Sequence, residues 1–336
     1  MRTRTQRSRL KAVIFAAAIC DTLVTPAPSP AQAAGDIASY PARPIRMVVG
    51  FTPGGLPDIT ARLIGPKLLE VWKQQVVVDN RPGAGGIIGT DIVAKANPDG
   101  YTLLSASSSH SATPAVRASL PYDTHKDFAT ITLTSKGAYA LVVSPAVGAK
   151  SVQELVALAR ARPGQLNFGS AGIGSGTHFA AELFKDLASI DVVHVAYKGI
   201  PEALTESVAG RVQFFMPPLA SAASLIKDGR LLALAVSTPK RVAGYTDIPT
   251  IAESGLPGYE WDAWSGLLAP AQTPRSIIDK LNREISRILN LPDVQQRMVA
   301  LGAEAVSTTP AQFDKLITEQ VAVTTKLARK AGIKAE

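Results

Sequence analysis

Two glycine-rich turns, one in each half of the chain, constrain the fold more than any other feature of the sequence. The first spans residues 50–58 and follows the apolar run Ile45–Val49, and the second spans residues 170–178 and follows Leu166–Phe168. A strand that turns through glycines into a helix exposes backbone N–H groups at the positive end of the helix dipole, where an anion binds well. The sequence therefore predicts a small acidic ligand held between two lobes.

The N-terminal residues are typical of a secretory signal peptide. Five basic residues among the first eleven precede the apolar run Ala12–Cys20, and Ala31-Gln32-Ala33 supplies the small-x-small pattern of a cleavage site. The apolar run is shorter than the ~20 residues that a membrane span needs. We therefore predict that residues 1–33 are a signal peptide, cleaved near Ala33, and that the mature chain is periplasmic.

The composition argues against several classes of function. The formal net charge is +8, of which the leader contributes four, and no dense Lys/Arg stripe marks a nucleic-acid partner. Loss of the leader also removes Cys20, the only cysteine, so the mature chain has no thiol nucleophile, disulfide or cysteine metal ligand. A chain of about three hundred residues usually divides its core, so two lobes are expected.

Short apolar runs alternate with helical patterns in both halves, which predicts an α/β fold with two parallel-type sheets flanked by helices. In the first half the predicted strands are Ile45–Val49, Val76–Val78 and Tyr101–Leu104, and the predicted helices are Asp58–Trp72 and Gly86–Ala96. In the second half the predicted strands are Leu166–Phe168, Val192–Val195, Phe214–Met216 and Leu231–Val236. Between these two series, Ser151 and Glu154 form a capping box that predicts a helix start.

No flexible linker separates the two halves, so strand crossovers are expected to join them. The predicted crossovers lie near Gly137–Ser144 and near Tyr259–Pro270. They place residues 34–140 and 263–336 in lobe 1 and residues 141–262 in lobe 2, so that the tail returns to the first lobe.

The tail itself predicts two helices. Thr273-Pro274 begins the first, whose apolar residues Ile278, Leu281, Ile285 and Ile288 fall on one core-facing stripe. The second is predicted from Pro310 to Ala331, and it ends at Gly332, a residue type that commonly terminates helices.

A series of motifs spread over nearly the whole mature chain carries a resemblance to a known family. In order they are residues 40–46 (Tyr-Pro-Ala-Arg-Pro-Ile-Arg), 52–58, 80–86 (Asn-Arg-Pro-Gly-Ala-Gly-Gly), 96–104, 120–128, 170–178, 197–199, 249–259, Ala269-Pro270 and Thr273-Pro274. With these motifs the chain resembles the substrate-binding proteins of tripartite tricarboxylate transporters, the TctC or Bug family of periplasmic receptors. The resemblance covers about Tyr40 to Ile333.

The resemblance implies a two-lobed periplasmic-binding-protein fold of the type II kind that closes on its ligand like a clamshell. The implied ligand is a small organic carboxylate: a dicarboxylate, a tricarboxylate, an acidic amino acid or an aromatic acid. The implied partners are membrane subunits of the TctA/TctB type, although some relatives serve in sensing. A monomer without a cofactor is expected.

In lobe 1 the first turn is expected to supply N–H groups and a hydroxyl to the ligand through Phe51, Thr52, Gly54 and Gly55. A plain strand–helix turn that needs glycine for its geometry is the alternative. Asp58 would repel an anion, so it is expected to cap or order the turn. Ser107 and Ser108 follow the third strand, at the edge where open α/β sheets bind ligands, although solvated loop serines would give the same pattern.

In lobe 2 the second turn is expected to hold the other end of the ligand through Ser170, Gly174, Ser175 and Thr177. His178 stands at the helix start, where it either contacts the ligand or makes a structural hydrogen bond. Tyr197, Lys198 and Gly199 end the next strand and are expected to face the cleft. Lys198 would neutralise a carboxylate there, or it is a solvated lysine at a strand end.

Three further residues are candidates either for contact with the ligand or for a structural role. Many relatives carry an acidic residue at the position of Gln213. If that residue binds the amino group of a ligand in those relatives, its absence here argues against an amino-acid ligand. A simple capping role for Gln213 is the alternative. Trp261 and Trp264 lie by the returning crossover, and we expect them to serve in hinge or core packing rather than in stacking on a ligand.

An enzyme is the strongest competing class, because Gly172-Ile173-Gly174 follows a strand and opens a helix. The dinucleotide-binding fingerprint needs a third glycine where Thr177 stands. The sequence contains neither a phosphate-binding loop of the Gly-x-x-x-x-Gly-Lys-Ser/Thr type nor a Gly-x-Ser-x-Gly elbow around the two turns, and its four histidines lack metal-site spacing. We therefore expect no catalytic residues and no metal. A receptor that signals to a membrane partner remains the second possibility.

Overall fold

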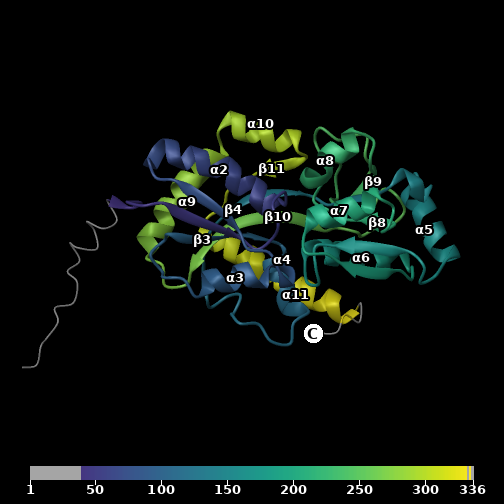
Figure 1. Ribbon diagram of the computed structural model, residues 1–336, viewed down its shortest axis with the longest axis horizontal. Helices are drawn as coiled ribbons and strands as arrows, with labels where there is room; N and C mark the ends of the chain where they lie inside the picture. Colours follow the sequence, from purple (N-terminus) through teal and green to yellow (C-terminus); the bar gives the residue numbers. More distant parts are fainter. Residues whose placement is uncertain (1–38, 331–332, 334–336) are drawn as a thin grey trace, which may run out of the picture. The chain divides into compact units, whose positions relative to one another are not determined.

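The computed structural model describes residues 39–330 and residue 333. The predicted signal peptide, and Gly332 at the predicted end of the last helix, lie outside these residues. The described chain forms two β-sheets with helices packed on their faces, which confirms the predicted fold class (Figure 1). Among the helices of this part of the chain, none combines the length and the apolar character needed to cross a membrane.

The first sheet has six strands. Its order is β11 (Ala303–Ala305), β4 (Phe128–Ala138), β10 (Asp262–Pro270), β3 (Thr102–Ser107), β1 (Ile45–Val49) and β2 (Val76–Asn80). Strand β1 pairs in parallel with β2 and β3, whereas β10 runs antiparallel to β3 and β4. Strand β1, which lies between β3 and the edge strand β2, is almost wholly buried, as expected for a strand covered on both faces.

Most of the helices along the first sheet come from the two ends of the described chain. They are α2 (Leu56–Trp72), α3 (Ile87–Ala94), α4 (Ser109–Ala112), α9 (Arg275–Leu289), α10 (Pro292–Ala300) and α11 (Pro310–Lys330), with short 3₁₀ turns at Ala84–Gly86 and Thr113–Ala115. The predicted apolar stripe of α9 is confirmed, because its isoleucines and its leucine at 281 are buried in the core. The tail therefore packs on the first sheet, to which β11 also belongs.

The second sheet has five strands. Its order is β7 (Val193–Ala196), β6 (Asn167–Ser170), β8 (Phe214–Phe215), β5 (Ala140–Val143) and β9 (Leu232–Val236). Its helices are α5 (Val152–Ala161), α6 (Gly176–Ala188), α7 (Ile200–Val208) and α8 (Leu219–Lys227), with a 3₁₀ turn at Pro145–Val147. The pairs of β6 with β7 and β8 are parallel, and β5 runs antiparallel to β8 and β9.

Local signals place the element boundaries to within a few residues. Ser151 caps α5 as predicted, since its hydroxyl accepts a hydrogen bond from the Glu154 N–H. The Glu154 carboxylate accepts from the Lys150 N–H rather than from the Ser151 N–H of an ideal capping box. Strand β3 continues to Ser107, beyond its predicted end at Leu104, because its polar end pairs with β10.

The chain passes between the two sheets at two adjacent points. A single residue, Tyr139, separates β4 from β5, and the returning chain passes through Trp261 into β10. The Ser237 hydroxyl ties the two points together, because it accepts from the Tyr139 N–H at 2.8 Å and donates to the Trp261 carbonyl. The whole stretch 262–270, predicted as part of a crossover, is a strand of the first sheet, and the crossing itself is confined to the residues just before it.

Candidate ligand-binding site

The two glycine-rich turns meet at one cavity. It has a volume of about 30 Å³, and residues from elements of both sheets line it. The lining includes Gly55, Leu56 and Pro57 at the N-terminus of α2, and Ser175, Gly176 and Thr177 at the N-terminus of α6. Two helix N-termini therefore direct the positive ends of their dipoles toward the same space.

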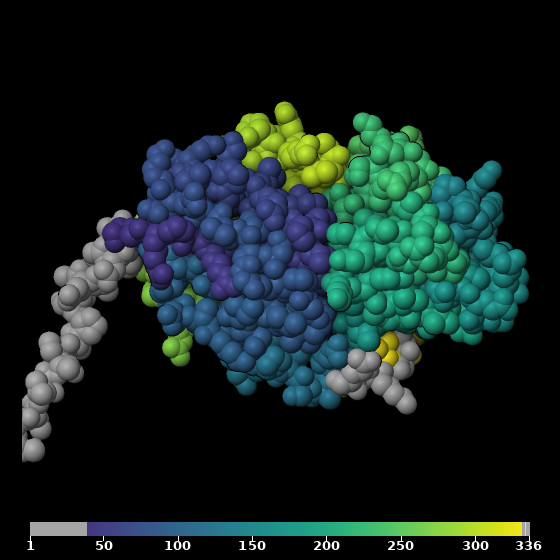
Figure 2. All heavy atoms as spheres, in the orientation of Figure 1, coloured from purple at the N-terminus to yellow at the C-terminus, as the bar shows by residue number. Residues whose placement is uncertain are grey.

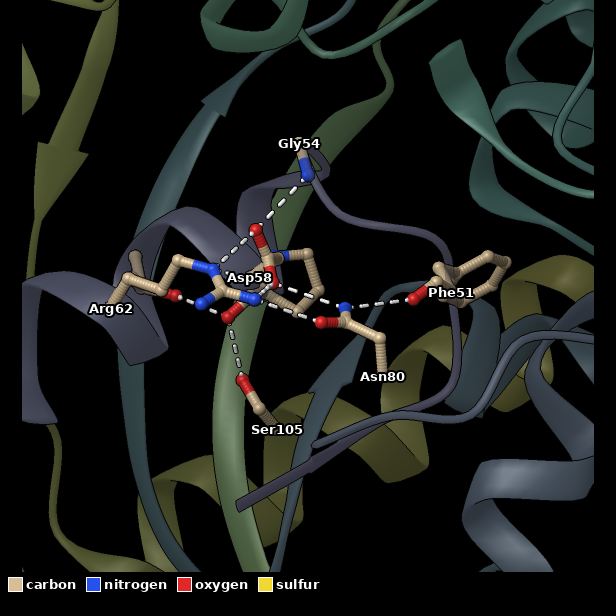
Figure 3. A network of polar contacts seen from close by, with 8 residues as sticks. Phe51, Gly54, Asp58, Arg62, Asn80 and Ser105 are labelled. Carbon is tan, nitrogen blue, oxygen red and sulfur yellow. Dashed lines mark hydrogen bonds and ion pairs between the residues drawn. The ribbon is translucent and has the colours of Figure 1, made fainter. Parts of the chain in front are cut away.

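Asp58 orders the first turn, as expected (Figure 3). Its carboxylate is buried at 3% exposure and accepts hydrogen bonds from the Gly54 N–H at 3.0 Å and from the Arg62 side chain. The Asn80 amide donates both to this carboxylate and to the Phe51 carbonyl, so it fixes the backbone on both sides of the turn. The guanidinium of Arg62 in α2 thereby compensates the negative charge of Asp58, which does not line the cavity.

Two serines, one at the end of β3 and one at the start of α4, form the polar part of the wall on the first-sheet side. Ser107 and Ser109 line the cavity, and the Ser107 hydroxyl donates to that of Ser109 at 3.2 Å. The Ser109 hydroxyl also accepts from the Gly176 N–H at 3.2 Å, so it joins the start of α4 to the N-terminus of α6. Ser108 points elsewhere: it is buried and bonds to the Tyr139 hydroxyl at 2.7 Å.

The second turn is held by its own hydroxyls. Ser175 is the N-cap of α6 and accepts from the His178 N–H at 3.2 Å. Thr177 accepts from the Ala171 N–H at 2.9 Å and bonds to the Ser175 hydroxyl at 2.8 Å. These bonds orient both hydroxyls while both residues still line the cavity, so the turn is ordered before any ligand arrives.

A pair of stacked histidines supports the second turn from behind. The rings of His178 and His194 lie 4.1 Å apart, and His178 Nδ1 lies 3.4 Å from the Gly174 N–H, which donates to it. His194 Nε2 lies 2.6 Å from the hydroxyl of Ser170. Burial lowers the pKa of His178 to about 3 and that of His194 to about 4, so both rings are neutral at pH 7. Of the two roles expected for His178, ligand contact and a structural hydrogen bond, the structure contains the hydrogen bond.

Glycines allow the elements of the first sheet and those of the second sheet to approach closely. A Cβ atom on Gly176 would lie 2.1 Å from the Tyr139 hydroxyl oxygen, and one on Gly199 would lie 1.9 Å from the hydroxyl oxygen of Thr52. In Figure 2 the blue spheres of the first-sheet elements meet the green spheres of the second-sheet elements without a wide opening on the face in view. The elements of the two sheets therefore lie in close contact at these two glycines.

The rest of the cavity wall is apolar and comes from remote segments that sequence patterns did not indicate. It includes Val49, Ile200, Pro218, Ala263 and Trp264, with Tyr139 at the crossing point. Trp264, expected in core packing, does pack against Phe313 but also reaches the cavity. Among the described residues that line the cavity, none carries a charge, so the polar groups that the cavity offers are backbone groups and hydroxyls.

Five of the predicted site residues line the cavity, namely Phe51, Gly55, Ser107, Ser175 and Thr177. The other nine lie around it: Thr52, Gly54, Ser108, Ser170, Gly174, His178, Tyr197, Lys198 and Gly199. Several of these hold the turns, as described above, and the Thr52 hydroxyl donates to the Glu202 carboxylate at 3.4 Å. Tyr197 is half-buried against the second sheet, and Lys198 is exposed.

Gln213 has a structural role that removes its predicted link to the ligand. Its side-chain carbonyl accepts from the Asn167 N–H at 2.7 Å, and its amide donates to the Gly210 carbonyl at 3.1 Å. The side chain closes the end of β6 and does not line the cavity. These contacts fit the structural alternative that was expected for Gln213.

Comparisons with known proteins agree with this architecture. Protein BugT of Bordetella pertussis is 35% identical over 298 residues, which cover 88% of this chain and 91% of BugT. A solved structure described as R. palustris Rpa4515 with adipate is 34% identical, with a TM-score of 0.86 over 88% of this chain and all of that one. MatC from Rhodopseudomonas palustris with bound malate is 31% identical, with a TM-score of 0.82 over 86% and 99% of the two chains.

The family model for the tripartite tricarboxylate transporter family receptor, TctC, matches residues 60–333. That range includes most of α2, the second glycine-rich turn and both crossing points between the sheets. The chain therefore belongs to the TctC/Bug family of solute-binding receptors.

Proposed function

We propose that this protein is a periplasmic receptor, exported by a leader cleaved near Ala33, that holds a small organic carboxylate between two lobes. The observation that carries the proposal is the convergence of the N-termini of α2 and α6 on one uncharged cavity. The binding of adipate and malate by solved relatives supports a carboxylate as the ligand.

The chemistry of the cavity matches an acid with a carbon skeleton. Backbone N–H groups at helix N-termini favour a carboxylate through hydrogen bonds and through the helix dipole. The apolar side chains of Leu56, Ile200 and Trp264 would then contact the carbon atoms of the ligand. In this arrangement the acid group is recognised by the backbone, and the remainder of the molecule by the wall.

Binding requires the two lobes to separate and close. A cavity of about 30 Å³ has room for roughly two water molecules, which is less than a ligand of several carbons occupies. We place the lobe boundaries at the two crossing points, with residues 34–140 and 263–336 in one lobe and residues 141–262 in the other. A ligand that contacts both lobes shifts the population toward the closed state.

The closed receptor would deliver its ligand to membrane subunits of the TctA/TctB type, which the family description favours. The alternative is a sensory receptor whose closed lobes dock on a membrane signalling protein. Both require a carboxylate in the cavity, so the binding experiment comes first.

A thermal-shift screen of the mature protein tests the proposal. The panel contains dicarboxylates, citrate, acidic amino acids and aromatic acids, each with its neutral amide analogue as a control. An acid at a hundred times its dissociation constant should add ~2.7 kcal/mol of stability. A shift that the amide analogue does not reproduce would support carboxylate binding, whereas a panel without any shift would contradict it.

A further inference from the structure

A second, smaller cavity adjoins the proposed binding site. Its volume is about 10 Å³, and it shares Phe51, Ser107 and Ser109 with the wall of the first cavity. It lies within the elements of the first sheet, between the end of β3 and the residues around Tyr122. A space of this volume holds roughly one water molecule or one hydroxyl group. Unlike the first cavity, it is lined mainly by polar side chains.

His110 lines this small cavity and has no hydrogen bond of good geometry at either ring nitrogen within the described part of the chain. The side chain is 4% exposed, and the rings of Tyr122 and Phe128 hold it in place at centroid distances of 6.4 and 5.0 Å. Burial lowers the pKa of His110 to about 4, against a smaller opposing effect of the Thr124 backbone. The ring is neutral at pH 7, so it offers one donor and one acceptor.

Three of the hydroxyls that line the cavity have already donated their protons. Ser105 donates to the Pro57 carbonyl at 2.9 Å, Thr90 to the Gly86 carbonyl at 2.9 Å, and Thr113 to the Ser109 carbonyl at 2.7 Å. A hydroxyl has one proton and two lone pairs, so these three groups can only accept a further hydrogen bond. A carboxylate oxygen placed here would face their lone pairs, whereas a group with its own proton would be satisfied.

We infer that this cavity is a second subsite, and that it selects ligands in which a hydroxyl group accompanies the carboxylate. The inference rests on the proposed function, because the carboxylate is held by the two turns. A ligand hydroxyl there can donate to a lone pair of a wall hydroxyl and accept from the ring N–H of His110, so both its donor and its acceptor capacity are used. An ammonium group fits less well, because no carboxylate among the described lining residues would compensate its charge.

Calorimetric titration of the mature protein with hexanoate, 2-hydroxyhexanoate, 6-hydroxyhexanoate and adipate tests the inference. We expect one of the two hydroxy acids to bind about tenfold more tightly than both hexanoate and adipate, as one additional hydrogen bond would give. His110→Phe should remove that preference while leaving the affinity for hexanoate within about twofold. His125→Phe is the matched control, because His125 is exposed and lies outside both cavities, and it should change neither affinity.

The outcomes separate this inference from the proposed function. If no acid in the titration or in the wider panel binds, the proposed function itself fails. If acids bind but neither hydroxy acid exceeds hexanoate, the subsite is wrong, as it also is if His110→Phe weakens all four probes equally. Should His110→Phe fail to fold, judged by circular dichroism, the comparison of the four probes on the unaltered protein decides alone.

Discussion

Asp58 illustrates how a buried charge beside the cavity can order a turn through backbone and side-chain partners. Its carboxylate is buried and receives hydrogen bonds from Gly54, Arg62 and Asn80, so its charge is compensated within the turn. Removing a partner from such a buried network leaves the remaining donors unsatisfied. At the scale of single residues, the integrity of the first turn therefore depends on this side chain.

Asp58→Asn should lower the free energy of unfolding by about 2 kcal/mol, because the Gly54 N–H and the Arg62 side chain lose a charged acceptor. Denaturant unfolding measures the change. Glu319→Gln is the control, since its ion pair with Lys315 is exposed and contributes under about 1 kcal/mol. Equal stability of Asp58→Asn and the unaltered protein would show that the network does not hold the turn.

The stacked histidines make stability depend on pH. The folded-state pKa values of His178 and His194 lie below the ordinary value of 6.5, so the unfolded chain binds protons that the folded chain does not. Their contribution is full above pH 6.5 and is lost as the pH falls toward 4, by at most about 1.4 kcal/mol per pH unit for each histidine.

His194→Gln should therefore reduce the loss of stability between pH 6.5 and pH 5, because one of the two groups no longer titrates. Urea unfolding of the variant and the unaltered protein at both pH values gives the comparison. The same loss of stability in both proteins would mean that His194 is not held neutral in the folded state.

At the scale of elements, the N-terminus of α6 can approach the first sheet only because residue 176 is a glycine. Its backbone donates to Ser109, and its Cα faces Ser108 and Tyr139 without room for a Cβ atom. This close approach lets two helix N-termini share one cavity. The sequence indicates the turn, but the space at residue 176 is set by side chains far away in the chain.

Gly176→Ala should weaken binding of any carboxylate found in the screen by at least about tenfold, since the added methyl group keeps the lobes apart. Gly169→Ala is the matched control, because a Cβ atom at that strand position makes ordinary contacts of 3.5 Å or more. Affinity is measured by calorimetry after circular dichroism confirms folding. An affinity of Gly176→Ala equal to that of the control would argue against closure at this point.

Elements with a strong local signal could be predicted from sequence, and the cavity wall could not. Strand β1 has the predicted bounds, and both glycine-rich turns reach the cavity because glycine and helix-start patterns act over a few neighbouring residues. Tyr139, Ile200 and Trp264 meet there only through the pairing of distant strands, which leaves no local pattern. Lys198 and Gln213 do not line the cavity, and no local pattern indicates this, since a side chain's direction depends on tertiary packing.

At the scale of the whole molecule, the two crossing points form one hydrogen-bonded unit. Ser237 bonds to Tyr139 through both its backbone and its side chain, and it also bonds to Trp261. Any movement of one sheet relative to the other must change the backbone or the hydrogen bonds of these three residues. The unit is thus the natural axis of the proposed closure.

Ser237→Ala should speed hydrogen exchange of the Tyr139 amide, because that N–H loses its hydroxyl acceptor. Mass spectrometry measures hydrogen exchange in the segment that contains Tyr139, and the amides of the distant helix α9 serve as the internal control. We also expect weaker carboxylate binding, since a looser axis populates open states more. Unchanged exchange at Tyr139 would place the axis elsewhere.

The uncharged cavity has a consequence for how such receptors diversify. Backbone N–H groups belong to every residue type except proline, so most mutations cannot remove the groups proposed to bind the acid. The wall, in contrast, consists of side chains such as Ile200, Ala263 and Trp264, each of which a single base change can replace. A receptor encoded by a duplicated gene could therefore come to bind a new carboxylate while it keeps the backbone groups that bind the acid group.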